Sequence, residues 1–289
     1  MEREELYRRA EGAAAAGNYA RAAEDLSKLY GEDGSLRTNC LLFFSLTKLG
    51  EHEQAVLVAE DRLQDYIADN ERFGQYLREK VLAGGTIKAL QLKRSLDGCM
   101  SAVERRHFDA VIEKAYSEFG GDTEKIERKF AHCGGLEPYG QLQACGSAEC
   151  LDEESYVRAA ARACPDPDLH PLVRGGILSE LKKLGFSGQM QCFCSLLGKV
   201  RSVVPAELPE IEETDAFSGL KERLETDSSI PSDLKERYLG EIRIRLMMVW
   251  AEADLLSSSG LDGLYSEFVG KSRSARAEWF ERQLEMLGK

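Results

Sequence analysis

A short pattern recurs three times in the first third of the chain, and it restricts the fold more than any other feature. Gly17-Asn18-Tyr19-Ala20-Arg21-Ala22 is followed by Gly50-Glu51-His52-Glu53-Gln54-Ala55 and by Gly84-Gly85-Thr86-Ile87-Lys88-Ala89. The opening glycines lie 33 and then 34 residues apart, and an alanine follows each glycine by five positions. A period in the low thirties, with a glycine turn between two short helices, indicates a helical repeat.

The residues around these turns follow helical spacing. The sequence predicts helices at 2–16 and 19–30 on the two sides of the first turn. In the second repeat it predicts a helix near 36–49, with Leu42, Phe43 and Leu46 facing inward, and a partner helix after Gly50. The third repeat follows the same plan around Gly84-Gly85. A fourth hairpin is expected around Gly120-Gly121, with helical residues on both sides.

These repeats resemble the tetratricopeptide repeat (TPR) family. The resemblance covers roughly residues 1–135 and implies a mainly α fold, a TPR-like right-handed superhelix of about three to four helical hairpins. In this family the second helix packs a small residue against the preceding helix, and Ala22, Ala55 and Ala89 match that position. The large aromatic residue early in the first helix and the closing proline of the family are missing, so the repeats are degenerate.

The resemblance also implies a function, because the first helices of TPR hairpins line a concave groove that binds proteins or peptides. Phe44 is the expected anchor, since Leu42, Phe43 and Leu46 already fill the inward face of its helix; the alternative is that Phe44 packs against the next hairpin. The carboxylate clamp of chaperone-binding TPR domains is absent from the matching positions. The family pattern places these residues in the groove, with Cys40 beside them: Tyr7, Glu11, Arg37, Phe44, Lys48, Glu71 and Arg78.

Residues 136–289 read as a second region that is helical except for one β-hairpin near 189–204. Met190, Cys192 and Cys194 alternate with polar and aromatic neighbours, which is typical of a strand. A proline-marked acidic connector follows at 205–215. A long helix is then expected from Pro231 to about Leu256, and the last helices are expected to cap the array.

Composition narrows the classes of function. The formal net charge of −12 argues against binding to nucleic acid or to an anionic membrane, both of which require clustered Lys and Arg. The apolar runs are too short to span a bilayer, and the charged N-terminus is unlike a signal peptide, so a cytoplasmic location is expected. Phosphate-loop, nucleophile-elbow and zinc-protease motifs are missing, so neither an enzyme nor a cofactor is expected.

Two alternatives to a noncatalytic scaffold for a protein or peptide partner remain. The first uses cysteines: the chain has 8, expected to be reduced thiols in the cytosol, and Cys145, Cys150, Cys192 and Cys194 could form a metal- or redox-responsive module. Their spacing is not standard for zinc, and burial as small apolar side chains accounts better for Cys192 and Cys194. The second is a homo-oligomer in which the groove or the hairpin edge accepts another copy.

Overall fold

The computed structural model describes residues 2–31, 34–258 and 260–287. The chain divides into two compact units. Unit 1 comprises Met1–Asp122 with Glu149–Asp152, and unit 2 comprises Thr123–Ala148 with Glu153–Lys289. Among the helices in these ranges, none combines the length and the apolar character needed to cross a bilayer.

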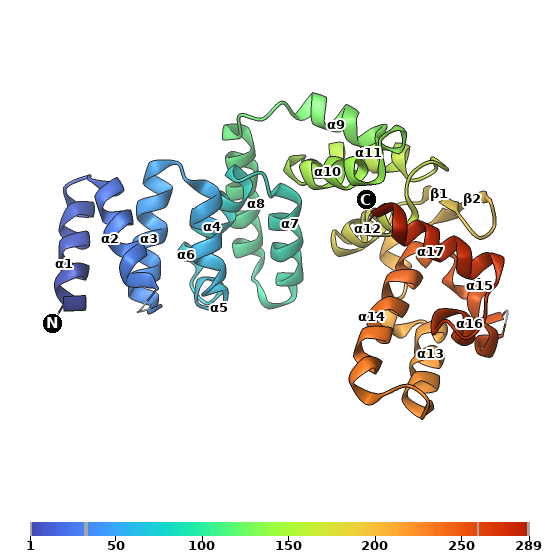
Figure 1. Ribbon diagram of the computed structural model, residues 1–289. Helices are drawn as coiled ribbons and strands as arrows, with labels where there is room; N and C mark the ends of the chain where they lie inside the picture. The colour runs from blue at the N-terminus through green and yellow to red at the C-terminus, as the bar shows by residue number, and fades with distance from the viewer. Residues whose placement is uncertain (1, 32–33, 259, 288–289) are drawn as a thin grey trace. The chain divides into compact units, whose positions relative to one another are not determined.

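Unit 1 is built of helices, and most of them pack against the next helix along the chain (Figure 1). The helix starts carry local signals: Ser35 and Asp69 each accept a hydrogen bond from a backbone amide of the first turn, and Ser101 forms a capping box with Glu104. The helices are α1 (Glu2–Ala15), α2 (Tyr19–Tyr30), α3 (Leu36–Leu49), α4 (His52–Glu60), α5 (Leu63–Ile67), α6 (Asn70–Leu82), α7 (Thr86–Ser95) and α8 (Ala102–Glu118).

The recurrent glycines make the same turn in all three hairpins. Gly17 and Gly50 have φ of 76°, and Gly84 has φ of 84°, a left-handed conformation that side chains disfavour. The three recurrent alanines, at positions 22, 55 and 89, are completely buried. The turn and the close helix contact expected from the sequence are therefore both present in α1–α2, α3–α4 and α6–α7.

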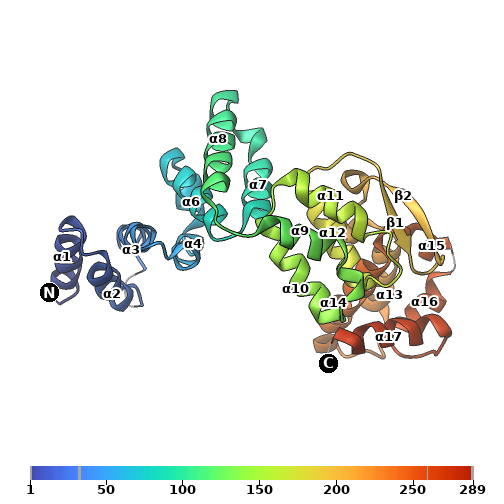
Figure 2. The same cartoon turned by 90° about the horizontal axis from the view of Figure 1, so that it is seen from above.

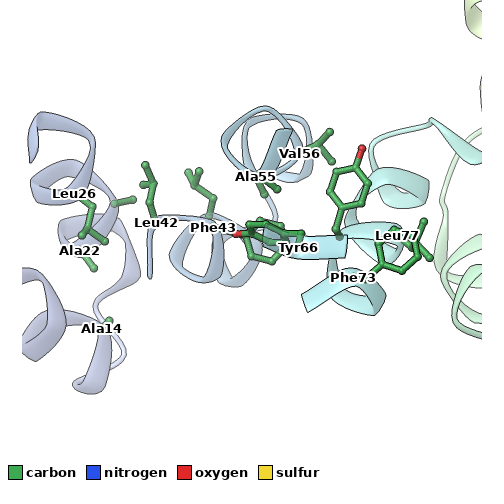
Figure 3. Close-up of a cluster of buried hydrophobic side chains, with 14 of the residues drawn as sticks. Ala14, Ala22, Leu26, Leu42, Phe43, Ala55, Val56, Tyr66, Phe73 and Leu77 are labelled. Carbon is green, nitrogen blue, oxygen red and sulfur yellow. The ribbon is translucent and has the colours of Figure 1, made fainter. Parts of the chain in front are cut away.

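The apolar core of unit 1 is one continuous cluster. Figure 3 shows part of it as a row of side chains that runs from Ala14 and Ala22 past Phe43 and Tyr66 to Leu77. Aromatic rings meet edge to face inside it, with 5.2 Å between the centroids of Phe43 and Tyr66.

A buried amide lies inside this core. Asn39, on α3, has no exposed surface. Its Nδ2 donates to the Tyr30 hydroxyl at 2.9 Å and to the Val58 carbonyl oxygen at 2.5 Å, and its Oδ1 accepts from the Tyr66 hydroxyl at 2.9 Å. Asn39 thus joins α2, α3, α4 and α5 through three hydrogen bonds of a buried amide.

Unit 2 combines helices with one antiparallel β-hairpin (Figure 2). Pro138 and Pro171 each occupy the first residue of a helix, where a missing N–H costs nothing. Its elements are α9 (Thr123–Ala131), α10 (Pro138–Ser147), α11 (Glu153–Ala163), α12 (Pro171–Lys183), β1 (Met190–Cys194), β2 (Lys199–Val203), α13 (Asp215–Thr226), α14 (Ser232–Met248), α15 (Ala253–Ser258), α16 (Leu261–Phe268) and α17 (Ala275–Leu287).

The predicted β-hairpin is confirmed. Cys192 of β1 lies opposite Arg201 of β2, and Gln191 lies opposite Ser202. The expected inward face is also present, because Met190, Cys192 and Cys194 are buried. On its other side β1 is held by the end of α11, since the Phe193 amide donates to the Cys164 carbonyl oxygen at 3.0 Å.

Three features differ from the expectation. The fourth hairpin is divided, because α8 belongs to unit 1 while α9 belongs to unit 2 and packs there against α11 and α10. A helix, α10, occupies a stretch in which Gly140 and Gly146 obscured the helical pattern. The long helix from Pro231 ends at Met248, where the chain makes a 3-10 turn (Trp250–Glu252) before α15.

Tertiary contacts account for that early helix end. The buried carboxylate of Glu252 accepts hydrogen bonds from the backbone amides of Leu196 at 2.9 Å and Leu197 at 3.3 Å, in the turn of the β-hairpin. The Trp250 indole donates to the Pro209 carbonyl oxygen at 2.8 Å. A continuous helix would break these bonds, so the tertiary contacts override the local helix preference.

Candidate functional site

The first part of the candidate site lies where α1 meets α3. The Arg37 guanidinium carbon is 3.7 Å from the centroid of the Tyr7 ring, and its nitrogens lie 3.6 Å from Glu4 and 3.9 Å from Glu11. Tyr7 is only 7% exposed. The structure therefore brings Tyr7, Glu11 and Arg37 together. The Arg37 guanidinium covers one face of the Tyr7 ring, so Tyr7 offers little exposed surface to a partner.

The second part lies further along α3. Phe44 is 41% exposed although it is apolar. Tyr19, the first residue of α2, contacts it edge to face with 5.8 Å between centroids, and the Lys48 ammonium lies 5.2 Å from the centroid of the Phe44 ring. The ring thus presents an apolar surface bordered by a cation, and it contacts the preceding hairpin through Tyr19.

Arg37, Phe44 and Lys48 share one face of α3, because their spacings of seven and four residues correspond to about two turns and one turn of helix. We call these three residues the α3 stripe. Cys40 lies half-buried beside it. Tyr19 belongs to the same surface and was missed in the sequence. The available signal was an aromatic residue at the first helical position after the Gly17-Asn18 turn.

The two residues expected from α6 lie in other contacts. Arg78 donates to Glu79 at 2.6 Å and to Glu118 of α8 at 2.8 Å, and the buried Glu79 also meets His52 of α4 at 2.6 Å. Glu71 is exposed and accepts from Gln75 at 3.3 Å. Arg78 is therefore neutralised inside a network that joins α4, α6 and α8. Among the described residues, no hydrogen bond or ion pair links Glu71 or Arg78 to the α3 stripe.

Five of the eight cysteines lie in unit 2. All eight lie in the described ranges and are free thiols. Within unit 2, Cys145 interacts with Cys133 and Cys164, and Cys164 in turn interacts with Cys192. Within the described part of the chain, no group of three or more His, Cys, Asp or Glu side chains is arranged to hold a metal ion.

We predict that the cysteines differ strongly in how fast their thiols react. Burial raises the pKa of Cys192 to about 12 and that of Cys194 to about 11. At about pH 8, therefore, only about one thiol in a thousand or fewer is ionised at these positions. Under native conditions iodoacetamide should label the exposed Cys99 first and leave Cys192 and Cys194 unlabelled until the protein is unfolded. Labelling of Cys192 as fast as Cys99, read by peptide mass spectrometry, would contradict this.

Comparison of the chain with family models, with curated proteins and with solved structures finds no match. The assignment of a function therefore depends on the geometry of the α1–α3 surface and on the repeat pattern.

Proposed function

We propose that this chain is a noncatalytic scaffold that binds a protein or peptide through unit 1, and that its hairpins are degenerate TPR-like repeats. Two observations support the repeat assignment: the left-handed glycines at 17, 50 and 84, and the fully buried alanines five residues after each of them. The single observation that carries the binding proposal is the exposed Phe44 ring on the α3 stripe.

The chemistry of the stripe supports one class of ligand. Phe44 and Tyr19 offer apolar ring surface for an apolar or aromatic side chain of the partner. Lys48 forms no ion pair with a described carboxylate and lies one helical turn from Phe44. A partner segment with an apolar anchor and a carboxylate about one turn away is the best fit, in either helical or extended form.

Mutation of Phe44 tests this proposal. Phe44→Glu should weaken partner binding by about tenfold to a hundredfold, because an anchor in an interface contributes about 2 kcal/mol or more and the new carboxylate repels the partner's acidic group. The measurement is retention of partners from a lysate on immobilised protein, quantified by mass spectrometry.

The matched control is Leu57→Glu, which replaces a 64% exposed leucine on α4 outside the stripe. A partner retained by wild type and by Leu57→Glu but lost by Phe44→Glu agrees with the proposal. If every retained partner binds Phe44→Glu as well as wild type, the stripe is not the binding surface. Circular dichroism of each variant verifies that the helices are intact.

A further inference from the structure

One edge of the β-hairpin in unit 2 is open. In an antiparallel pair, residues alternate between those that bond to the partner strand and those whose N–H and C=O groups point away from it. The Phe193 amide points away from β2, because it donates to Cys164. By the register, the outward groups of β2 then belong to Val200 and Ser202. Neither forms a backbone hydrogen bond with another described residue on that side.

A pocket of about 500 Å³ borders this edge, which is within the usual size range of ligand sites. Ser202 and Val203 of β2 form part of its wall. Leu208, Ala253 and the buried ring of Trp250 supply apolar lining, and the hydrogen bond from the Trp250 indole to Pro209 fixes that ring. We call this cavity the β2 pocket.

The lining of the β2 pocket is strongly acidic. Four carboxylates line it, and its one basic lining residue, Arg201, lies 3.5 Å from Asp254. Three of the four, Glu207, Glu213 and Asp215, form no ion pair with a described residue. The amino end of α13 contributes only about half a positive charge. The net charge of the lining is therefore negative. Its acidic residues are Glu207, Glu213, Asp215 and Asp254.

We propose that the open edge of β2 binds an extended segment of another protein, and that a Lys or Arg of this segment enters the β2 pocket. The segment's backbone would bond to the outward groups of Val200 and Ser202, as in strand addition to a sheet edge. The aliphatic stem of Lys or Arg matches the apolar lining residues, and its charged end matches the acidic ones. This site lies in unit 2 and does not depend on the α3 stripe.

A second copy of the chain is a poor occupant for this edge. An antiparallel β2–β2 pair that uses the outward groups of both Val200 and Ser202 places Arg201 directly opposite Arg201 of the other copy. Like charges directly opposite one another destabilise a strand pair. The charge of β2 therefore favours a partner of different sequence.

Synthetic peptides test the proposal. The probes are capped peptides in which Val and Thr alternate around a central Lys, with matched peptides that carry Glu at the centre. Binding is read from the fluorescence of Trp250 in a Trp279→Phe background, because the chain has only 2 tryptophans. The Lys peptide should bind with a Kd below about 1 mM and about tenfold more tightly than the Glu peptide. Equal affinities, or no binding of the Lys peptide, would overturn the proposal.

Two variants separate backbone pairing from charge. Ser202→Pro removes an outward N–H without breaking the hydrogen bonds between β1 and β2. It should therefore weaken binding of the Lys peptide at least about tenfold. The Ser202→Thr variant keeps the N–H and should bind the Lys peptide with normal affinity. Glu207→Gln with Asp215→Asn should bring the Lys and Glu peptides to similar affinity. The control, Glu222→Gln with Glu236→Gln, removes two exposed carboxylates outside the pocket and should leave the preference intact.

Three results would count against this assignment. Normal binding of the Lys peptide to Ser202→Pro would show that the edge is not used. An unchanged Lys preference in Glu207→Gln with Asp215→Asn would place the basic side chain elsewhere. A dimer in sedimentation velocity that Ser202→Pro abolishes would make a second copy the occupant.

Discussion

Replacing Gly175 with alanine should destabilise unit 2 by about 3 kcal/mol, whereas alanine at the adjacent Gly176 should be neutral or stabilising by up to about 1 kcal/mol. Both glycines lie inside α12. A Cβ at Gly175 would collide with the Met247 carbonyl oxygen, which is backbone of α14 and cannot rotate away. A Cβ at Gly176 meets nothing within 4 Å. Only the first substitution must push α12 and α14 apart.

Urea unfolding followed by tryptophan fluorescence measures this difference directly. Trp250 and Trp279 both belong to unit 2, so the signal reports on that unit. The midpoint for Gly175→Ala should fall with little change in the slope, while that for Gly176→Ala should stay or rise. Similar midpoints for the two variants would mean that α12 and α14 are not in close backbone contact at this position.

Replacing Asn39 with alanine should destabilise unit 1 by about 2–4 kcal/mol. The substitution removes the amide that bonds to the Val58 carbonyl oxygen and to the Tyr66 hydroxyl, at a position with no exposed surface of its own. Burial raises the pKa of Tyr66 far above its usual range, so this hydroxyl keeps its proton and its need for an acceptor at any ordinary pH. Asn70→Ala is the control, because Asn70 is exposed and its bond to Glu104 should contribute less than about 0.5 kcal/mol.

The readout is urea unfolding by far-ultraviolet circular dichroism, with tryptophan fluorescence marking unit 2 in the same samples. For Asn39→Ala the circular dichroism transition should begin at lower urea while the fluorescence transition is unchanged. The double variant with Tyr66→Phe should lose less stability than the sum of the single variants, because both single variants break the same Asn39–Tyr66 hydrogen bond. Full additivity would show that Asn39 and Tyr66 are not coupled.

Local signals were sufficient to predict much of unit 1. Glycines at a regular period predicted turns, and Gly17, Gly50 and Gly84 adopt the left-handed conformation that such turns require. Alternation along 190–194 predicted the strand, because successive side chains of a strand point to opposite faces and only one face is buried. These features depend on residues close together in the chain.

The sequence was less informative where distant residues determine the outcome. The break after Met248 depends on Glu252 bonding to the hairpin turn, more than fifty residues away in the chain. The ion pair that takes Arg78 away from the α3 stripe is formed with Glu118, which comes from a later helix. The burial of Tyr7 depends on Arg37, whose position follows from the packing of α1 and α3. Helical spacing assigns a residue to a face of its own helix but does not identify the side chain that covers it.

The most direct test of the binding proposal is photo-crosslinking in living cells with benzoylphenylalanine at position 44, compared with the same residue at position 57. Both positions are exposed and apolar in the wild type, but only Phe44 belongs to the α3 stripe. We expect a crosslinked partner from position 44 that is absent from position 57 and is reduced when Lys48→Glu is added. No adduct at position 44, or the same adducts at both positions, would contradict the proposal that unit 1 binds its partner through this surface.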